Sequence, residues 1–195
     1  YQVNSAYVGT RETLFLTAMA RTQWTGIDGA PTMQSFTANI PFSSKNIGLG
    51  FLAVNQNAGA HGSTRIMATF GYHLRLGNGH LSFGASAGTI NNRFNWGKAT
   101  FKDLADQVQS SGVENTYTAN FNFASYFYTN TLYVGIQFDN INQSEFSTVP
   151  DGKSRNYLNF NAVIGKAFVL SKNVVFKPSA LGRVTKSAFL AELNL

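Results

Sequence analysis

The chain has 195 residues, enough for one domain, and its sequence shows no linker to a second. Charged residues make up only 12%, roughly half the usual share for a soluble domain, whereas aromatic residues reach 14% and the formal net charge is +6. The absence of cysteine excludes disulfides and thiolate metal sites, and no apolar run reaches the roughly eighteen residues of a transmembrane helix.

The first half of the chain predicts strands, because apolar and polar residues alternate along it. Successive side chains of a strand point to opposite faces, so a period of two gives one apolar and one polar face. The clearest case is 63–90, where Gly77-Asn78-Gly79 separates two long alternating runs and predicts a tight hairpin. Strands are predicted at residues 13–24, 31–40, 46–56, 63–76 and 80–90.

The second half continues the same pattern after a long irregular stretch at 91–115. A polar loop is predicted at 139–155. Pro178 falls within a predicted strand, where a bulge would accommodate its missing N–H group. Strands are predicted at residues 116–128, 131–138, 156–170 and 173–185, and from 188 to the end.

Strand length and loop length together favour a membrane barrel. Most predicted strands have about ten to fifteen residues, whereas soluble strands average about five or six and membrane strands need about nine to eleven. Short turns also alternate with longer loops, as in outer-membrane barrels. We therefore predict an all-β, antiparallel up-and-down transmembrane β-barrel, with about ten strands in this chain as part of a larger barrel. The alternative is a soluble β-sandwich or a secreted lectin-like barrel.

Several basic residues fall on the polar faces of the predicted strands. A cation that faces lipid in mid-membrane costs about 2–4 kcal/mol, so these side chains are expected to line the interior. Two roles remain open for them: they favour anions or the acidic tail of a partner, or they pair with acidic groups elsewhere in the interior. The predicted lumen-facing residues are Arg21, Arg65, His73, Arg75, Lys177 and Arg183.

No motif predicts catalysis, a cofactor or a metal site. The histidines His61, His73 and His80 lack the spacing of metal ligands, of which a site needs three or four. A barrel hydrolase would need Ser and His together at the outer rim, whereas Ser82 and Ser86 lie near His80 at a turn on the opposite side. The basic residues are spread over several strands, which argues against nucleic-acid binding. The sequence therefore predicts a non-enzymatic protein without a cofactor.

Two motifs near the N-terminus resemble a known family. The segment Trp24-Thr25-Gly26-Ile27-Asp28-Gly29-Ala30-Pro31 is similar to the Trp-x-Gly-x-Asp-Gly-Ala-Pro pattern of the PorP/SprF family, outer-membrane proteins of the type IX secretion system. The preceding Asn4-Ser5-Ala6-Tyr7-Val8-Gly9 is similar to the family's Asn-Pro-Ala-Tyr-Ala-Gly, with Ser5 where the family usually has Pro. The resemblance covers the whole chain. Its most specific positions are Trp24, Gly26, Asp28, Gly29, Ala30 and Pro31.

The resemblance implies a non-enzymatic component of secretion or gliding motility in the bacterial outer membrane, whose signal peptide is absent or already removed. Its implied partners are outer-membrane lipids, the periplasmic ring lipoprotein, and the C-terminal domains of secreted cargo or of a surface adhesin, with no nucleic acid among them. The alternative function is a porin-like channel for small solutes.

Members of the family are longer and end in further strands. Residues 1–195 are therefore expected to form a single outer-membrane barrel domain that lacks C-terminal strands. The long loops would offer a binding surface for partners. The candidate partner-loop residues are Phe94, Trp96, Phe101, Asp103, Asp106 and Phe146.

Overall fold

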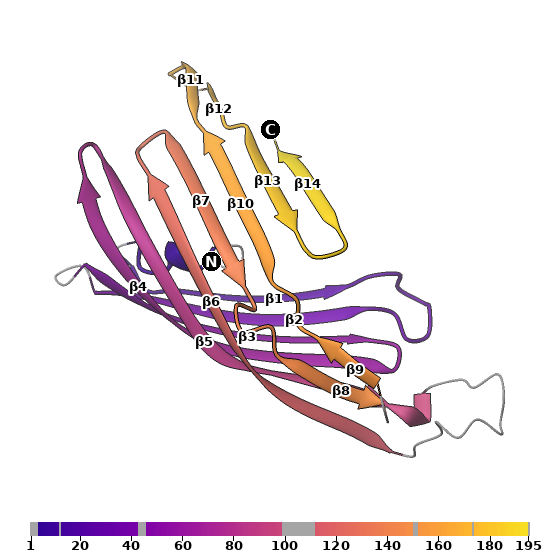
Figure 1. Cartoon of the computed structure of the whole chain (residues 1–195). Helices are drawn as coiled ribbons and strands as arrows, with labels where there is room; N and C mark the ends of the chain where they lie inside the picture. Colours follow the sequence, from indigo (N-terminus) through magenta and orange to yellow (C-terminus); the bar gives the residue numbers. More distant parts are fainter. Residues whose placement is uncertain are drawn as a thin grey trace.

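Ten strands form one antiparallel sheet in the computed structural model, which describes residues 4–11, 13–42, 46–98, 112–149, 152–172 and 174–194 (Figure 1). Each strand pairs with the previous and the next strand of the sheet along the chain, so the topology is up-and-down. The strands, in spatial order, are β1 (Phe15–Thr22), β2 (Thr32–Phe42), β3 (Ile47–Ala58), β4 (His61–Leu76), β5 (Gly79–Asn95), β6 (Val113–Tyr128), β7 (Leu132–Asp139), β10 (Asn159–Lys166), β13 (Ser179–Val184) and β14 (Phe189–Asn194).

Four further strands form two separate hairpins. Strands β8 (Glu145–Val149) and β9 (Gly152–Arg155) pair at the end of the sheet that carries the long loops, and β11 (Phe168–Ser171) and β12 (Val174–Phe176) pair at the opposite end (Figure 1). Two 3₁₀ helices complete the described part of the chain, η1 (Ser5–Tyr7) and η3 (Trp96–Lys98). No helix in the described ranges is long and apolar enough to cross a membrane.

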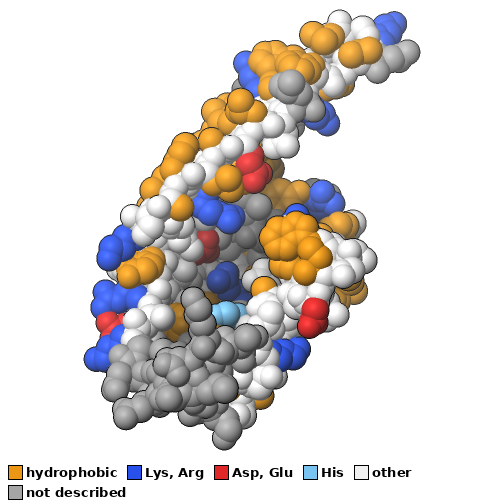
Figure 2. All heavy atoms as spheres, turned by 90° about the vertical axis from the view of Figure 1, so that its right-hand side faces the viewer, with side chains coloured by type: hydrophobic (Ala, Val, Ile, Leu, Met, Phe, Trp, Pro, Cys, Tyr) orange, Lys and Arg blue, Asp and Glu red, His pale blue; other side chains and the backbone are white. Residues whose placement is uncertain are grey.

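The large sheet curls around a hollow and stays open at its edges. Figure 2 looks into the curl from the end that carries β8 and β9, and shows the wall surrounding a hollow that contains charged side chains. Among the described residues, β1 pairs only with β2 and β14 only with β13, so the two edges are not joined. The prediction of an all-β antiparallel sheet is confirmed, and a closed barrel is not present in this part of the chain.

The predicted faces of the strands are confirmed on β4. Ile66 and Phe70 are 47% and 49% exposed on the convex face, whereas Met67 and Thr69 are 1% and 4% exposed on the concave face. The hydrogen-bond register extends the convex face as an apolar row across five strands, made by Ile40, Leu49, Phe70, Ala85 and Phe123. Alternation along each strand thus becomes a continuous apolar outer surface when the strands pair.

Two predicted loops contain regular structure. Strand β5 continues to Asn95 and β6 starts at Val113, so both strands extend into the stretch that was predicted to be irregular. The predicted polar loop at 139–155 holds the β8–β9 hairpin. Both predictions were wrong at these places because the polar residues of these segments do not show a clear alternation.

Pro178 interrupts two strands rather than forming a simple bulge. The β10–β13 ladder ends where Gly165 faces Ser179, and the chain then continues as the separate β11–β12 hairpin. The Lys166 amide donates to the Pro178 carbonyl at 3.1 Å, but the next amide, of Ala167, donates to Thr131 across the sheet at 2.7 Å. Since proline has no N–H group, the ladder cannot continue through it, and both predicted strands are split in two.

The β8–β9 hairpin carries an exposed ion pair between Arg155 and Glu145. The hydrogen bond from Arg155 and its positive charge lower the pKa of Glu145 from its ordinary value. Because the folded-state pKa is depressed, the stabilisation by this pair is present above the unfolded-state pKa and is lost as the pH falls through the folded-state pKa.

We expect Arg155→Gln to raise the titration midpoint of Glu145 while leaving the thermal midpoint of unfolding almost unchanged. Both side chains are about half exposed, at 46% and 52%, and exposed pairs contribute little to stability. The midpoint is measured from the carboxyl carbon shift of Glu145 by NMR. An unchanged midpoint in the variant would show that the pair does not form.

Candidate functional site

Residues 4–10 lie inside the curl of the sheet and are called the plug below. The helix η1 in this segment packs against β4, β5 and β6. Asn4 and Ser5 are 5% and 4% exposed, and Ala6 and Val8 are completely buried. The chain's own N-terminal segment therefore occupies the interior at this level, along β4, β5 and β6.

Hydrogen bonds attach the plug to strands on both sides of the hollow. The Asn4 side-chain amide donates to the carbonyls of Ser125 on β6 and Ile136 on β7, at 3.2 and 3.1 Å. The Ser5 amide donates to Gln137 Oε1 at 2.5 Å, and the Gly9 amide donates to Asn39 Oδ1 on β2 at 2.7 Å. The plug thus links β2 with β6 and β7, which are far apart in the sheet order.

Three glycines on the concave face make room for the plug. Gly48, Gly71 and Gly84 face one another in the register of β3, β4 and β5. A Cβ atom on Gly84 would lie 2.5 Å from the Ala6 nitrogen, one on Gly71 would lie 2.6 Å from a Val8 methyl, and one on Gly48 would lie 2.5 Å from the Gly9 Cα. The plug can lie this close to the wall only because these positions have no side chain.

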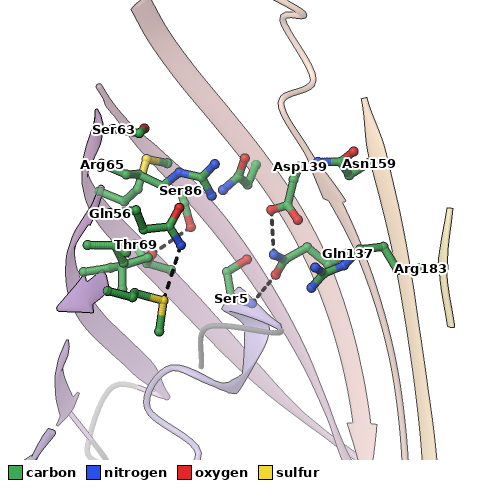
Figure 3. A pocket seen from close by; sticks show the side chains of 15 residues that line it. Ser5, Gln56, Ser63, Arg65, Thr69, Ser86, Gln137, Asp139, Asn159 and Arg183 are labelled. Carbon is green, nitrogen blue, oxygen red and sulfur yellow. Dashed lines mark hydrogen bonds between the residues drawn. The ribbon is translucent and has the colours of Figure 1, made fainter. Parts of the chain in front are cut away.

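A cavity of about 380 Å³ lies next to the plug, with Ser5 in its lining (Figure 3). Its polar wall is a chain of hydrogen bonds around Asp139. Gln137 Nε2 and Asn161 Nδ2 each donate to one carboxylate oxygen of Asp139, at 2.6 and 2.7 Å. Arg183 Nε in turn donates to Asn161 Oδ1 at 2.6 Å. This network fixes the Asp139 carboxylate and the Arg183 guanidinium on the wall formed by β7, β10 and β13.

Arg65 enters the same cavity from β4, on the opposite wall (Figure 3). In the described ranges of the chain, the only ion pair joins Arg155 and Glu145 on the outer hairpin. Arg65, Arg183 and Asp139 therefore share one cavity without a direct ion pair between them. Of the two roles predicted for the interior cations, close pairing with acidic groups is not observed at these residues.

A second cavity of about 540 Å³, called the vestibule below, lies toward the long-loop end. Arg21 contributes a cation from β1, and Phe146 and Ser154 of the β8–β9 hairpin contribute to its wall. Arg93 also borders the vestibule, but its Nη2 atom donates to Asn57 Oδ1 at 2.8 Å and its guanidinium lies over Gly62, on the convex face. Among the described residues, no acidic side chain lines the vestibule.

The six predicted lumen-facing residues divide into three groups. Arg21, Arg65 and Arg183 line the vestibule or the cavity. His73 lies next to the plug, and its Nδ1 atom is 2.7 Å from Ser82 Oγ. Arg75 lies at the short-turn end of β4, and Lys177 lies between β12 and β13, outside the ten-stranded sheet.

The Ser82–His73 pair does not resemble a hydrolase site. Ser82 is completely buried, so a substrate could not reach its hydroxyl group. In the described ranges no group of three or more His, Cys, Asp or Glu side chains could hold a metal ion.

The Trp24–Pro31 motif forms the loop between β1 and β2. Gly26 and Gly29 have positive φ angles of 95° and 72°, and the Gly59 amide of the next long-side turn donates to the Gly29 carbonyl at 2.9 Å. A Cβ atom on Gly29 would lie 3.1 Å from the Gly59 Cα, so glycine permits this contact. Trp24 itself is 69% exposed. The loop is tied to its neighbour while its aromatic side chain projects outward.

The candidate partner-loop residues occupy different surroundings. Phe94 is on β5 and lies between His61 and Trp96, with ring centroids 4.7 and 4.6 Å away, and Trp96 is only 5% exposed. Phe146 lines the vestibule. Phe101, Asp103 and Asp106 lie outside the described residues.

Several residues of this site were not predicted as site residues. Asn4 to Val8 were noted only as part of a motif, and Asp139 was placed in a loop rather than at the end of β7. One signal was available for Asp139: it lies two residues after Gln137 and therefore shares a strand face with it.

A family model described as "Type IX secretion system membrane protein PorP/SprF" matches residues 1–195. No curated protein and no solved structure matches the chain.

Proposed function

Because the chain belongs to the PorP/SprF family of type IX secretion system membrane proteins, we propose that its curled sheet is the wall of an outer-membrane β-barrel. In this proposal the barrel is a non-enzymatic scaffold of the secretion system and does not conduct solutes. It holds secreted cargo or an adhesin at the cell surface and contacts the periplasmic ring lipoprotein on its other side.

The membrane position is supported by the convex face. The apolar row that contains Leu49, Phe70 and Phe123 runs across several strands, and each of these side chains is at least 40% exposed. A soluble protein rarely leaves such a continuous apolar surface in water, whereas lipid would cover it. The unpaired edges of β1 and β14 support closure by additional strands, because no open sheet edge is tolerated in the hydrocarbon region.

The observation that carries the scaffold role is the plug. Its buried residues and its hydrogen bonds to β2, β6 and β7 occupy the interior that a solute would have to cross. A porin-like channel needs an open aqueous lumen, so the plug favours the scaffold over the channel.

The proposed orientation of the barrel in the membrane is based on the lengths of its loops. Outer-membrane barrels have short periplasmic turns and long extracellular loops. The β8–β9 hairpin would then face the cell surface, and the β11–β12 hairpin would face the periplasm. The outer hairpin is attached to the wall, because Thr116 Oγ1 on β6 donates to the Ser147 carbonyl at 2.5 Å. A hairpin that is fixed to the wall at this end is suited to hold a partner domain.

Replacing residues 142–156 by a short Gly-Ser linker is expected to release the cargo or adhesin from cells into the medium. The change removes the β8–β9 hairpin and leaves the strands of the wall in place. Cargo in cell and medium fractions is measured by immunoblotting, together with the amount of the barrel in the outer membrane.

The matched control replaces residues 168–176, the hairpin at the opposite end, by the same linker. This control is expected to keep cargo on the cells and to reduce recovery of the ring lipoprotein when the barrel is pulled down. Cargo that stays on cells of the first variant, with normal amounts of barrel, would contradict the proposed role of the outer hairpin.

A further inference from the structure

The cavity and the vestibule adjoin each other inside the curl of the sheet. They share Met33, Gln56 and Ser63 in their walls, and β4 contributes to both, from His61 at the outer end to Thr69 at the inner end. At about 3.3 Å per residue, this part of β4 corresponds to a path of roughly 26 Å. The path is closed at its inner end by the plug and is entered from the long-loop end (Figures 2 and 3).

The path carries excess positive charge. Among the described residues, its walls present three arginine side chains, Arg21, Arg65 and Arg183, and one acidic side chain, Asp139. Both oxygens of that carboxylate already accept hydrogen bonds, from Gln137 and Asn161. None of these three guanidinium groups is in an ion pair within the described ranges, although Asp139 attracts Arg65 and Arg183 at longer range. The side chains that face the path carry a net positive charge, which favours a negatively charged ligand.

The N–H donors of the arginine side chains match carboxylate groups. A guanidinium group presents a planar fork of N–H donors that matches a carboxylate. Within the described part of the chain, Arg65 makes no hydrogen bond that would compete for its donors. Arg183 uses only Nε there, toward Asn161, so its terminal Nη atoms remain available. Amide and hydroxyl side chains of Gln56, Ser63 and Asn159 line the same walls and can bind peptide groups.

The spacing of the arginines points to an extended ligand. In the strand register Arg21 lies in the row that passes through Met33 and Gln56 to Ser63. Arg183 lies in the row that passes through Asn161, Gln137, Ala124 and Gly84 to Gly71. These two rows meet β4 eight residues apart, which is roughly 26 Å. A small dicarboxylate is much shorter than this distance and could occupy only one end of the path.

We propose that the cavity and the vestibule together bind an extended acidic segment of a polypeptide, inserted from the long-loop end, with carboxylates at Arg21 and at Arg65 and Arg183. The proposal goes beyond the role given above to the outer hairpin and does not depend on it, because binding is measured on the isolated protein.

Binding is tested with the purified full chain in detergent micelles. The probe is a fluorescein-labelled peptide of about eight residues in which Glu and Ser alternate, and the comparison peptide has Gln in place of each Glu. We expect the Glu peptide to raise the fluorescence anisotropy with saturation and the Gln peptide to bind at least about tenfold more weakly. Salt should weaken the binding, because the vestibule contacts are partly exposed.

Arg65→Gln and Arg183→Gln are each expected to weaken binding by about tenfold or more, as loss of a charged hydrogen bond predicts. The matched control is Arg75→Gln, which removes the same charge from the same face of β4 at the other side of the plug. This control should bind the Glu peptide as the unaltered protein does. Folding of each variant is checked by its heat-modifiable mobility on gels.

Three results would overturn the proposal. They are equal binding of the Gln peptide, an equal loss of affinity in Arg75→Gln, and no saturable binding of the Glu peptide by the folded protein. Succinate serves as the small-ligand probe. If succinate displaces the peptide at concentrations similar to those at which the peptide itself binds, the site is one for small carboxylates. This result would also contradict the proposal of an extended ligand.

Discussion

Deleting residues 4–10 is expected to convert a non-conducting protein into an open pore in planar lipid bilayers. The plug fills the interior with Ala6 and Val8, both completely buried, and nothing else in the described ranges replaces these contacts when the segment is removed. The cavity and vestibule would then continue to the short-turn end. Stepwise single-channel currents measure the change, with the unaltered protein as the reference.

A point substitution tests the same contact without shortening the chain. Gly84→Ala places a Cβ atom 2.5 Å from the backbone of Ala6, so the plug has to move away from the wall. We expect this variant to show intermittent conductance and a free energy of unfolding lowered by about 1–3 kcal/mol, as for overpacking in other tight contacts.

The matched control is Gly182→Ala on β13, where an added Cβ atom meets nothing within 4 Å. It should remain non-conducting, with nearly unchanged stability. A deletion variant that inserts normally but carries no current would show that other parts of the protein close the lumen, and would remove the plug as the basis of the scaffold role.

Phe70→Arg is expected to lower the free energy of unfolding in lipid vesicles by about 2–4 kcal/mol, the cost of a cation at the bilayer midplane. Phe70 lies near the middle of β4 on the convex face and is 49% exposed. Equilibrium unfolding in urea, followed by tryptophan fluorescence, measures the difference.

Leu76→Arg is the depth control on the same face of the same strand. Leu76 is the last residue of β4 and is 58% exposed, so an arginine there should cost only about 0–1 kcal/mol. Similar small effects at both positions would argue that the convex face does not contact the membrane interior. They would support the soluble alternative.

The strands could be predicted from the sequence because their signal is local. From residue 66 to 76 on β4 and from 117 to 123 on β6, every second residue is apolar, and this pattern is sufficient to give the strand and both of its faces. The register of the hairpin followed from its Gly77-Asn78-Gly79 turn. For these elements, the tertiary structure adds little to what the neighbouring residues already determine.

The plug could not be predicted because its position depends on residues far away in the chain. Asn4 to Val8 show no alternation, and their place inside the sheet is decided by Gly48, Gly71 and Gly84. These glycines are visible in the sequence, one on the polar face of each of three strands. They become a continuous row only when the register brings them together. The interruption at Pro178, in contrast, depends on a single residue that is visible in the sequence. Only the size of the interruption was predicted wrongly, because a bulge was expected and two strands are split.

The two ends of the plug are hydrogen-bonded to strands that lie at very different distances along the chain. The bond from Gly9 to Asn39 closes a loop of only 30 residues, whereas the bond from Ser5 to Gln137 joins residues 132 positions apart. If the hairpins are added to the membrane in chain order, the trailing end of the plug can be fixed once β2 is in place. Its leading end has to wait for β7. Protection of the Ser5 amide from hydrogen exchange should therefore appear late during folding, and would report that seven strands of the wall have been assembled.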